Sequence, residues 1–174
     1  MIIISVDNKL RDFPPLLRLA TNLKKLYKKP VILSSFFDLQ DLVISHRNKI
    51  DCVLLSYAKK NNSFILETIK RTKVRTFVYD QEGAGGFDGH GLNKVIKKNI
   101  QYIKDIVDVY FFWGSAQLKK NKKILDDINV KTDSVGYLRF SNFINHENKI
   151  KYENFYLINS NFAITSPRYN SKKK

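Results

Sequence analysis

The chain has little cysteine, and it has no long apolar run. Its one cysteine, Cys52, excludes an internal disulfide and favours a reducing compartment, and we expect it to be a small buried core residue. No apolar run approaches the roughly 20 residues that a membrane-spanning helix needs. The apolar start, Ile2–Ile4, lacks a preceding basic region and does not indicate a signal peptide. These absences predict a soluble, cytoplasmic protein.

The motifs of several common catalytic and nucleotide-binding sites are also missing. The sequence has no Gly-Lys-Ser/Thr phosphate loop, no nucleophile elbow, no His-Glu-x-x-His and no paired Cys-x-x-Cys. Segment 7–12, which follows the first apolar run, contains no glycine, so the dinucleotide-binding fingerprint is absent where it would belong. Lys9 and Arg11 in that segment could contact an acidic substrate, although a solvated loop is the simpler interpretation. We assign no role to His46 and His146.

Acidic residues are few: the sequence has 16 of them against 31 lysines and arginines, which gives a net charge of +15. A charge of this size attracts polyanions such as nucleic acid, anionic lipid headgroups or phosphorylated substrates. The lysines are spread over several expected helices and arginine is scarce, which disfavours base-specific recognition of nucleic acid. A non-catalytic basic module that binds nucleic acid or an anionic membrane is therefore an alternative function, with nucleic acid the weaker partner.

The chain does have a regular alternation of strand-like and helix-like segments. The expected strands are Ile2–Val6, Val31–Leu33, Cys52–Leu55, Thr76–Tyr79, Val109–Trp113 and Val130–Val135. The first expected helix is capped by Asp12 and has Pro14 and Pro15 in its first turn. The other expected helices are segments 38–46, 63–71, 92–107 and 115–128. Apolar strands that alternate with helices predict an α/β fold, a three-layer Rossmann-like domain with a mainly parallel sheet.

Glycine is scarce, yet five of the seven glycines lie in the segment from Gly83 to Gly91, between an expected strand and an expected helix. Asp80 and Glu82 open this segment, and either could act as a general base for a hydroxyl nucleophile. Together with Asp88 and His90 they could instead gather a divalent metal ion, the weakest of the alternatives because no second ligand cluster supports it. A plain surface loop is slightly favoured by composition alone.

Two further loops follow expected strands and could bind an anion. Because parallel strands all end at one edge of a sheet, we expect both loops to lie at the same edge as the glycine-rich segment. Backbone amides at Trp113–Ser115 could hold an anion at a helix start, although Ser115 as a simple cap explains the residues equally well. Gly136 and Arg139 could bind a phosphate or carboxylate, and Arg139 could equally pair with an acidic residue of another loop.

Four short motifs occur in a fixed order along the chain. They are Tyr79–Gly83, Tyr110–Gly114, Val135–Phe140 and Tyr156–Phe162. In this order they resemble a family of bacterial surface carbohydrate biosynthesis proteins, which are similar to GT-B glycosyltransferases. The chain departs from the family pattern at Gln81, where a glutamate is usual, and at Ser141, where an aspartate is usual.

The resemblance implies a two-domain enzyme of which this chain is the amino-terminal, acceptor-side half. It implies that residues 1–141 form the Rossmann-like acceptor domain, 142–154 a linker, and 155–174 a stub of a missing carboxyl-terminal donor-binding domain. A natural truncation, a two-chain enzyme with a separate donor-binding chain, and a shortened piece of a longer protein all fit this expectation.

The function implied by the resemblance is inverting transfer from a nucleotide sugar, in the synthesis of a surface polysaccharide or lipid-linked glycan. Glu82, or Asp80, would remove a proton from the acceptor hydroxyl as the nucleotide leaves. The expected substrate contacts are Gly83, Gly85, Gly86, His90, Ser115, Gly136 and Arg139. No metal or cofactor is expected beside the nucleotide-sugar substrate. Basic helix faces would hold the domain at the inner face of an anionic membrane. The chain alone would have little or no transferase activity. A third hypothesis is that the chain is a folded remnant without a catalytic role.

Overall fold

The computed structural model describes residues 1–80 and 90–140 of the chain. The chain divides into two compact units, Met1–Ile144 and Asn145–Lys174, and all described residues belong to the first. The predicted linker at 142–154 and the predicted stub at 155–174 lie outside the described residues. The fold is therefore the fold of the first unit.

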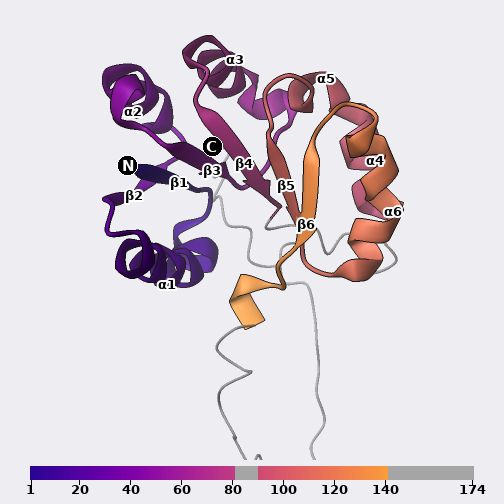
Figure 1. Ribbon diagram of the computed structural model, residues 1–174, viewed down its shortest axis with the longest axis horizontal. Coiled ribbons are helices and arrows are strands. Elements are labelled where there is room, and N and C mark those ends of the chain that lie inside the picture. The colour runs from indigo at the N-terminus through magenta and orange to yellow at the C-terminus, as the bar shows by residue number, and fades with distance from the viewer. Residues whose placement is uncertain (81–89, 141–174) are drawn as a thin grey trace, which may run out of the picture. The chain divides into compact units, whose positions relative to one another are not determined.

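A six-stranded sheet forms the centre of this unit (Figure 1). Its strands are β1 (Ile2–Val6), β2 (Val31–Ser35), β3 (Cys52–Leu55), β4 (Arg75–Tyr79), β5 (Val109–Phe112) and β6 (Lys131–Ser134). They lie in the order β2-β1-β3-β4-β5-β6, and every neighbouring pair is parallel. The predicted α/β fold with a parallel sheet is confirmed.

Helices connect the successive strands. They are α1 (Lys9–Tyr27), α2 (Leu39–His46), α3 (Ser63–Thr72), α4 (His90–Lys98), α5 (Ile100–Ile103) and α6 (Ser115–Asp126). Short 3₁₀ turns are η1 (Arg47–Lys49), η2 (Lys60–Asn62) and η3 (Leu138–Phe140). Each predicted helix between strands is present, and the largest differences are the start of α1 and the division of segment 92–107.

The first helix begins earlier than the sequence predicts. Its N-cap is Asn8, whose side-chain oxygen accepts a hydrogen bond from the Arg11 amide at 3.0 Å. The prediction of Asp12 as the cap is wrong, because Asp12 lies one turn inside α1 and is completely buried. Pro14 and Pro15 consequently lie within the helix rather than in its first turn.

The predicted helix at 92–107 is divided into α4 and α5 at Asn99. The Asn99 side chain donates to the Val95 carbonyl at 2.8 Å and accepts from the Lys60 amide at 3.1 Å. A side chain with two backbone partners competes with the regular hydrogen bonds of a helix. The contact with Lys60, 39 residues earlier in the chain, explains why periodicity alone did not show this break.

Two apolar clusters, one on each face, attach the helices to the sheet. Ile3 and Val53 belong to the larger cluster, which receives side chains of α2, α3, α4, α5 and α6. Ile4 belongs to the smaller one, which receives Leu16 and Ala20 of α1. Successive residues of a strand point to opposite faces, so Ile3 and Ile4 enter different clusters. Figure 1 shows α1 on one side of the sheet and α2 and α3 on the other, which is the predicted three-layer arrangement.

Aromatic side chains continue the α1 face of the sheet across β4 and β5. Phe77 and Phe111 pack edge to face, with ring centroids 6.0 Å apart and planes at 78°. Their strand neighbours Val78 and Tyr110 belong to the cluster on the opposite face. This alternation extends the apolar α1 face of the sheet beyond the strands that α1 itself contacts.

Cys52 is half-buried, whereas the sequence predicts a small buried core residue. It is the first residue of β3, at the amino edge of the sheet. Burial still raises the pKa of its thiol.

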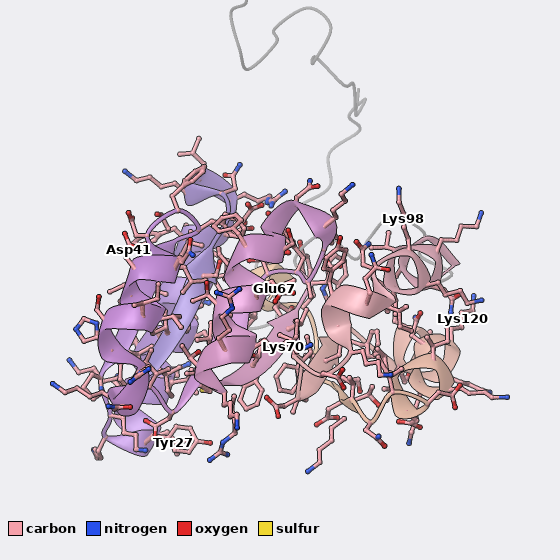
Figure 2. The ribbon with its side chains drawn as sticks, turned by 90° about the horizontal axis from the view of Figure 1, so that it is seen from above. Tyr27, Asp41, Glu67, Lys70, Lys98 and Lys120 are labelled. Atoms are coloured by element: carbon pink, nitrogen blue, oxygen red, sulfur yellow. The ribbon has the colours of Figure 1, made fainter. Side chains whose placement is uncertain are left out.

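The lysines of the helices point into solvent, as the sequence predicts. Figure 2 shows Lys70 of α3 near the middle of the view, and Lys98 of α4 and Lys120 of α6 on the side away from Tyr27. All three lysines are exposed. The positive charge therefore covers several faces rather than one stripe.

Candidate functional site

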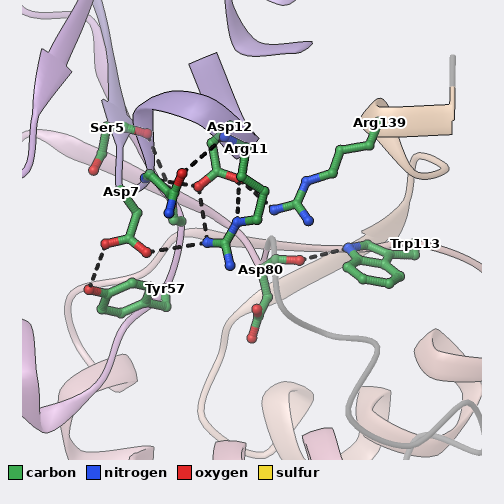
Figure 3. Close-up of polar contacts among 10 residues, drawn as sticks. Ser5, Asp7, Arg11, Asp12, Tyr57, Asp80, Trp113 and Arg139 are labelled. Atoms are coloured by element: carbon green, nitrogen blue, oxygen red, sulfur yellow. Dashed lines mark hydrogen bonds and ion pairs between the residues drawn. The ribbon is translucent and has the colours of Figure 1, made fainter. Parts of the chain in front are cut away.

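The loops that follow β1, β4, β5 and β6 meet at one edge of the sheet, where all the parallel strands end (Figure 3). Ligands of open parallel sheets bind at this carboxyl edge. We call this edge, formed by Asp7–Asp12, Tyr79, Asp80, Trp113 and Gly136–Arg139, the carboxyl rim. The direct contacts described below confirm that Asp80, Trp113 and the turn at Gly136–Arg139 converge, as the order of the loops predicts.

The Tyr79 hydroxyl joins the end of β4 to the turn after β6. It donates to the Gly136 carbonyl at 2.9 Å and accepts from the Leu138 amide at 2.9 Å. Gly136 has a φ of +81°, a conformation that suits glycine and directs its carbonyl toward Tyr79. Burial raises the pKa of Tyr79 to about 12, so the hydroxyl keeps its proton at physiological pH and can donate it.

Trp113 joins β5 to both neighbouring loops. Its indole Nε1 donates to the Asp80 carbonyl at 2.6 Å. Its ring stacks on Tyr137, with centroids 3.9 Å apart and planes at 28°. The start of the glycine-rich segment and the turn after β6 are therefore fixed to the same side chain.

A buried carboxylate holds the last part of the rim. Asp12 is completely buried, and it pairs with Arg139 from the far end of the described chain. It also accepts from Arg11 Nε at 3.0 Å and Arg11 Nη2 at 3.1 Å. The Arg139 guanidinium carbon lies 5.4 Å from the centre of the Tyr137 ring. Of the two predicted roles for Arg139, the structure shows pairing with an acidic residue, which belongs to a helix rather than a loop.

Segment 7–12 is more ordered than the predicted solvated loop. Lys9–Asp12 are helical, and Arg11 Nη2 lies 3.4 Å from Asp7 Oδ2. Tyr57, which follows β3, donates its hydroxyl proton to Asp7 Oδ1 at 3.3 Å. The interpretation of this segment as a plain solvated loop is wrong, because its charged side chains pair with one another and with neighbouring strand ends.

Asp80 is placed differently from the other rim residues. Its side chain is 4% exposed, and its carboxylate accepts a hydrogen bond from Tyr110 at 3.4 Å. Burial raises the pKa of Tyr110 well above its ordinary value, and the neighbouring Asp80 carboxylate raises it further. Figure 3 shows the Asp80 carboxylate directed away from Arg11 and Asp12. The backbone of Asp80 thus belongs to the rim, while its carboxylate lies toward the core.

The other predicted site residues are placed as follows. Ser115 is the first residue of α6 and is exposed, and the N-cap is Gly114, so the prediction of Ser115 as the cap is wrong. The Trp113 amide instead donates to the Gln117 side chain at 3.1 Å, which occupies the start of the helix. His90 begins α4, and its side chain lies outside the described part of the chain. Glu82, Gly83, Gly85 and Gly86 also lie outside the described residues.

Sequence reasoning missed Asp12 as a rim residue, although a signal was present. Asp12 precedes Leu16 by four residues and Ala20 by eight, and this spacing places all three on one face of a helix. An acidic residue on a buried helix face needs a partner. Tyr79 and Tyr137 gave no comparable signal, because their roles depend on contacts between loops.

The described rim encloses little space. A shallow hollow lies beside it, lined by Ser5, Phe36, Leu55, Ser56, Tyr57 and Asn62, and it encloses no space that a water molecule could fill. Sites for ligands the size of a drug usually have about 300–1,000 Å³. Within residues 1–80 and 90–140, no group of three potential metal ligands is present, and no helix is long and apolar enough to cross a bilayer.

Comparisons of the chain with protein families, with curated proteins and with solved structures gave no match. The chemistry of the carboxyl rim is therefore argued from its own residues.

Proposed function

We propose that this chain is the acceptor-side half of a glycosyltransferase that makes a surface polysaccharide or a lipid-linked glycan by inverting transfer from a nucleotide sugar. The observation that carries the proposal is the joining of three loops at the carboxyl rim. Trp113 bonds to the Asp80 carbonyl, and Tyr79 bonds to the turn at Gly136. A substrate held against this rim would meet the start of the glycine-rich segment and the turn after β6 at the same time.

The burial of Asp80 gives the two candidate bases, Asp80 and Glu82, different roles in this proposal. A carboxylate with 4% exposure that already accepts from Tyr110 is poorly placed to take a proton from an acceptor hydroxyl. Asp80 then acts as a positioning residue that fixes where the glycine-rich segment begins. Glu82, two residues further along, is the general base in this proposal.

The remaining predicted contacts take supporting roles in the same proposal. Gly83, Gly85 and Gly86 allow the backbone to approach the acceptor closely, and His90 and Ser115 contact it from helix starts. Arg139 is occupied by Asp12 and holds the turn at Gly136 in place. Substrate contacts at that turn would come from its backbone and from Tyr137.

A separate donor-binding half completes the enzyme in this proposal. The small hollow beside the rim is too limited to enclose a nucleotide sugar. The donor would bind between two halves, so the chain alone transfers little or no sugar. The domain would work at the inner face of a membrane, where lipid-linked acceptors are found.

Glu82→Gln tests the proposed base in a complex reconstituted with a donor-binding half, using radiolabelled nucleotide sugars and lipid-linked acceptors. Removing a general base lowers the rate by about 10²–10⁴-fold. Glu67→Gln is the matched control, because Glu67 is exposed on the outer side of α3 (Figure 2). Transfer at the wild-type rate by the Glu82 variant would argue against this role.

The alternative function, a non-catalytic basic module, is favoured only by the net charge of +15. Arginine makes most specific contacts with bases. Arg11 and Arg139 are both engaged by Asp12, which removes two of the few arginines from any nucleic-acid surface. A salt titration of DNA binding tests this alternative. Weak binding that is lost at moderate salt would be purely electrostatic and would leave a nucleic-acid function without support.

A further inference from the structure

The outer face of α1 carries an unusual set of exposed apolar side chains. Leu10 is 91% exposed, Leu17 46% and Phe13 38%. Residues at spacings of three and seven lie on one face of a helix, so the three form a single stripe. Leu16 and Ala20 lie on the adjoining side of the helix, which is buried against the sheet, so the three exposed residues border the buried face. We call Leu10, Phe13 and Leu17 the α1 stripe.

Every exposed charged side chain of α1 is basic, and Thr21, Asn22, Leu26 and Tyr27 are exposed as well. Lys24 continues the line of the stripe, and Lys9 and Lys25 flank it. The one acidic residue of α1, Asp12, is buried and paired with two guanidinium groups. Lys28, the left-handed residue that ends the helix, adds a further exposed cation. The exposed side of α1 therefore combines an apolar half with a cationic half.

The α1 stripe lies at the carboxyl rim. The helix begins three residues after β1, and the adjacent β2 ends in register with it, since Val6 pairs with Ser35. Phe37, which follows β2 at the same edge of the sheet, is 84% exposed. The start of α1 and the loop after β2 thus present large apolar side chains to solvent where the proposed substrate site opens.

We propose that the α1 stripe docks on an anionic bilayer, with Leu10, Phe13 and Leu17 entering the headgroup region and the lysines contacting lipid phosphates. Interfacial helices bind in this way, through apolar side chains on one face and cations beside them. Cations near an anionic leaflet add to the attraction. The proposal rests on the proposed function for its biological setting, because a lipid-linked acceptor would then be held beside the carboxyl rim.

The combination of lysines and apolar side chains on α1 favours an anionic bilayer over other occupants. Nucleic acid would satisfy the lysines, but it would leave the apolar stripe without a partner. A second copy of the chain in a two-fold contact would bring the lysines of both copies into one interface, and α1 offers them no exposed acidic side chain as a partner. An anionic bilayer satisfies both halves of the surface.

Vesicle flotation with the full chain tests the proposal. We expect binding to vesicles of phosphatidylcholine with phosphatidylglycerol, and at least tenfold weaker binding to phosphatidylcholine alone. The variant Leu10→Ser/Phe13→Ser/Leu17→Ser should lower the partition coefficient about tenfold or more. The matched control is Ile44→Ser/Phe64→Ser, which replaces exposed apolar residues of α2 and α3.

A second pair of variants tests the lysines. Lys24→Gln/Lys25→Gln should weaken binding about tenfold, at about threefold per exposed cation after partial screening. Lys122→Gln/Lys123→Gln removes the same charge from α6 and should have a much smaller effect, since α6 lies on the other side of the sheet (Figure 1). The single change Leu10→Glu affects an almost fully exposed side chain and should fold normally while it also weakens binding.

Three results would overturn the proposal. They are equal binding to charged and uncharged vesicles, wild-type binding by both the serine variant and Leu10→Glu, and a dimer in solution that dissociates when the stripe is replaced. The last result would identify a second copy as the occupant. Vesicle binding is measured without sugar transfer, and Glu82→Gln should bind like the wild type. Loss of one proposal would therefore be distinguished from loss of the other.

Discussion

The buried carboxylate of Asp12 provides the sharpest test of the rim. The change Asp12→Asn keeps the shape of the side chain but removes the charge that Arg11 and Arg139 share. Removing one partner of a buried ion pair costs about 3–5 kcal/mol. Arg11 and Arg139 keep 30% and 23% of their side-chain surface exposed, so their uncompensated charges regain part of their hydration. We therefore expect the free energy of unfolding to fall by about 2–4 kcal/mol.

The two partners of Asp12 predict an order of effects. Arg139→Gln leaves Asp12 with both hydrogen bonds from Arg11, so we expect a smaller loss of about 1–2 kcal/mol. In the double variant, removal of Arg139 should cost less than it does alone, because its carboxylate partner is already gone. The resulting interaction energy should lie within the range of about 0.5–3 kcal/mol that contacting residues show.

Urea unfolding followed by far-UV circular dichroism measures these losses. The matched control is Asp51→Asn, which makes the same change in an exposed carboxylate held by Lys29 at 2.5 Å. Exposed ion pairs contribute little to stability, so the control should retain almost all of it. Equal losses for Asp12→Asn and Asp51→Asn would refute the reasoning, and so would simple additivity in the cycle.

Two further predictions concern the aromatic contacts of the rim. Tyr79→Phe removes both hydrogen bonds to the turn after β6 and should cost about 1–3 kcal/mol in urea unfolding. The pKa of Tyr79 is raised to about 12, so its contribution should be complete below about pH 10 and lost as the pH rises toward 12. Wild-type protein should lose more stability over that interval than the variant, and parallel curves would contradict the burial of the hydroxyl. Trp113→Phe keeps a ring against Tyr137 but removes the hydrogen bond to the Asp80 carbonyl. The free energy of unfolding in urea should fall by about 1–2 kcal/mol. An unchanged urea midpoint would count against that hydrogen bond.

The layers of the fold could be predicted because their signals are local. β3 begins and ends where the apolar run Cys52–Leu55 does, and α3 differs from its predicted range at one residue. A strand that is buried on both faces must be apolar throughout, and a helix on a sheet must repeat with its own period. Neither condition depends on which strand lies next to which.

The helix boundaries that failed depend on contacts beyond the local pattern. Asn8 and Asp12 both have side chains suited to capping, and the burial of Asp12 left Asn8 as the cap. Asn99 interrupts a good helical pattern because the Lys60 amide, from another connection, lies within reach of its side chain. Periodicity measures the face of a helix and carries no information about such partners.

The functional site, like the fold, has a part that could be predicted from the sequence and a part that could not. The carboxyl rim was predicted from the order of strands and loops, because parallel strands all end at one edge. The residues that hold it together were mostly not predicted: Tyr79, Trp113 and Tyr137 become a unit only through the adjacency of β4, β5 and β6.

By itself, the sequence determined that the strands are parallel and most of them apolar, that helices cover both faces, and that three unusual loops share an edge. Composition and periodicity are sufficient for those properties because each element must bury its own apolar side. Only the tertiary structure decided that β1 lies between β2 and β3 and that Asp12 takes Arg139, 127 residues later, as its partner. Such pairings depend on the relative positions of elements, which no local pattern of residues encodes.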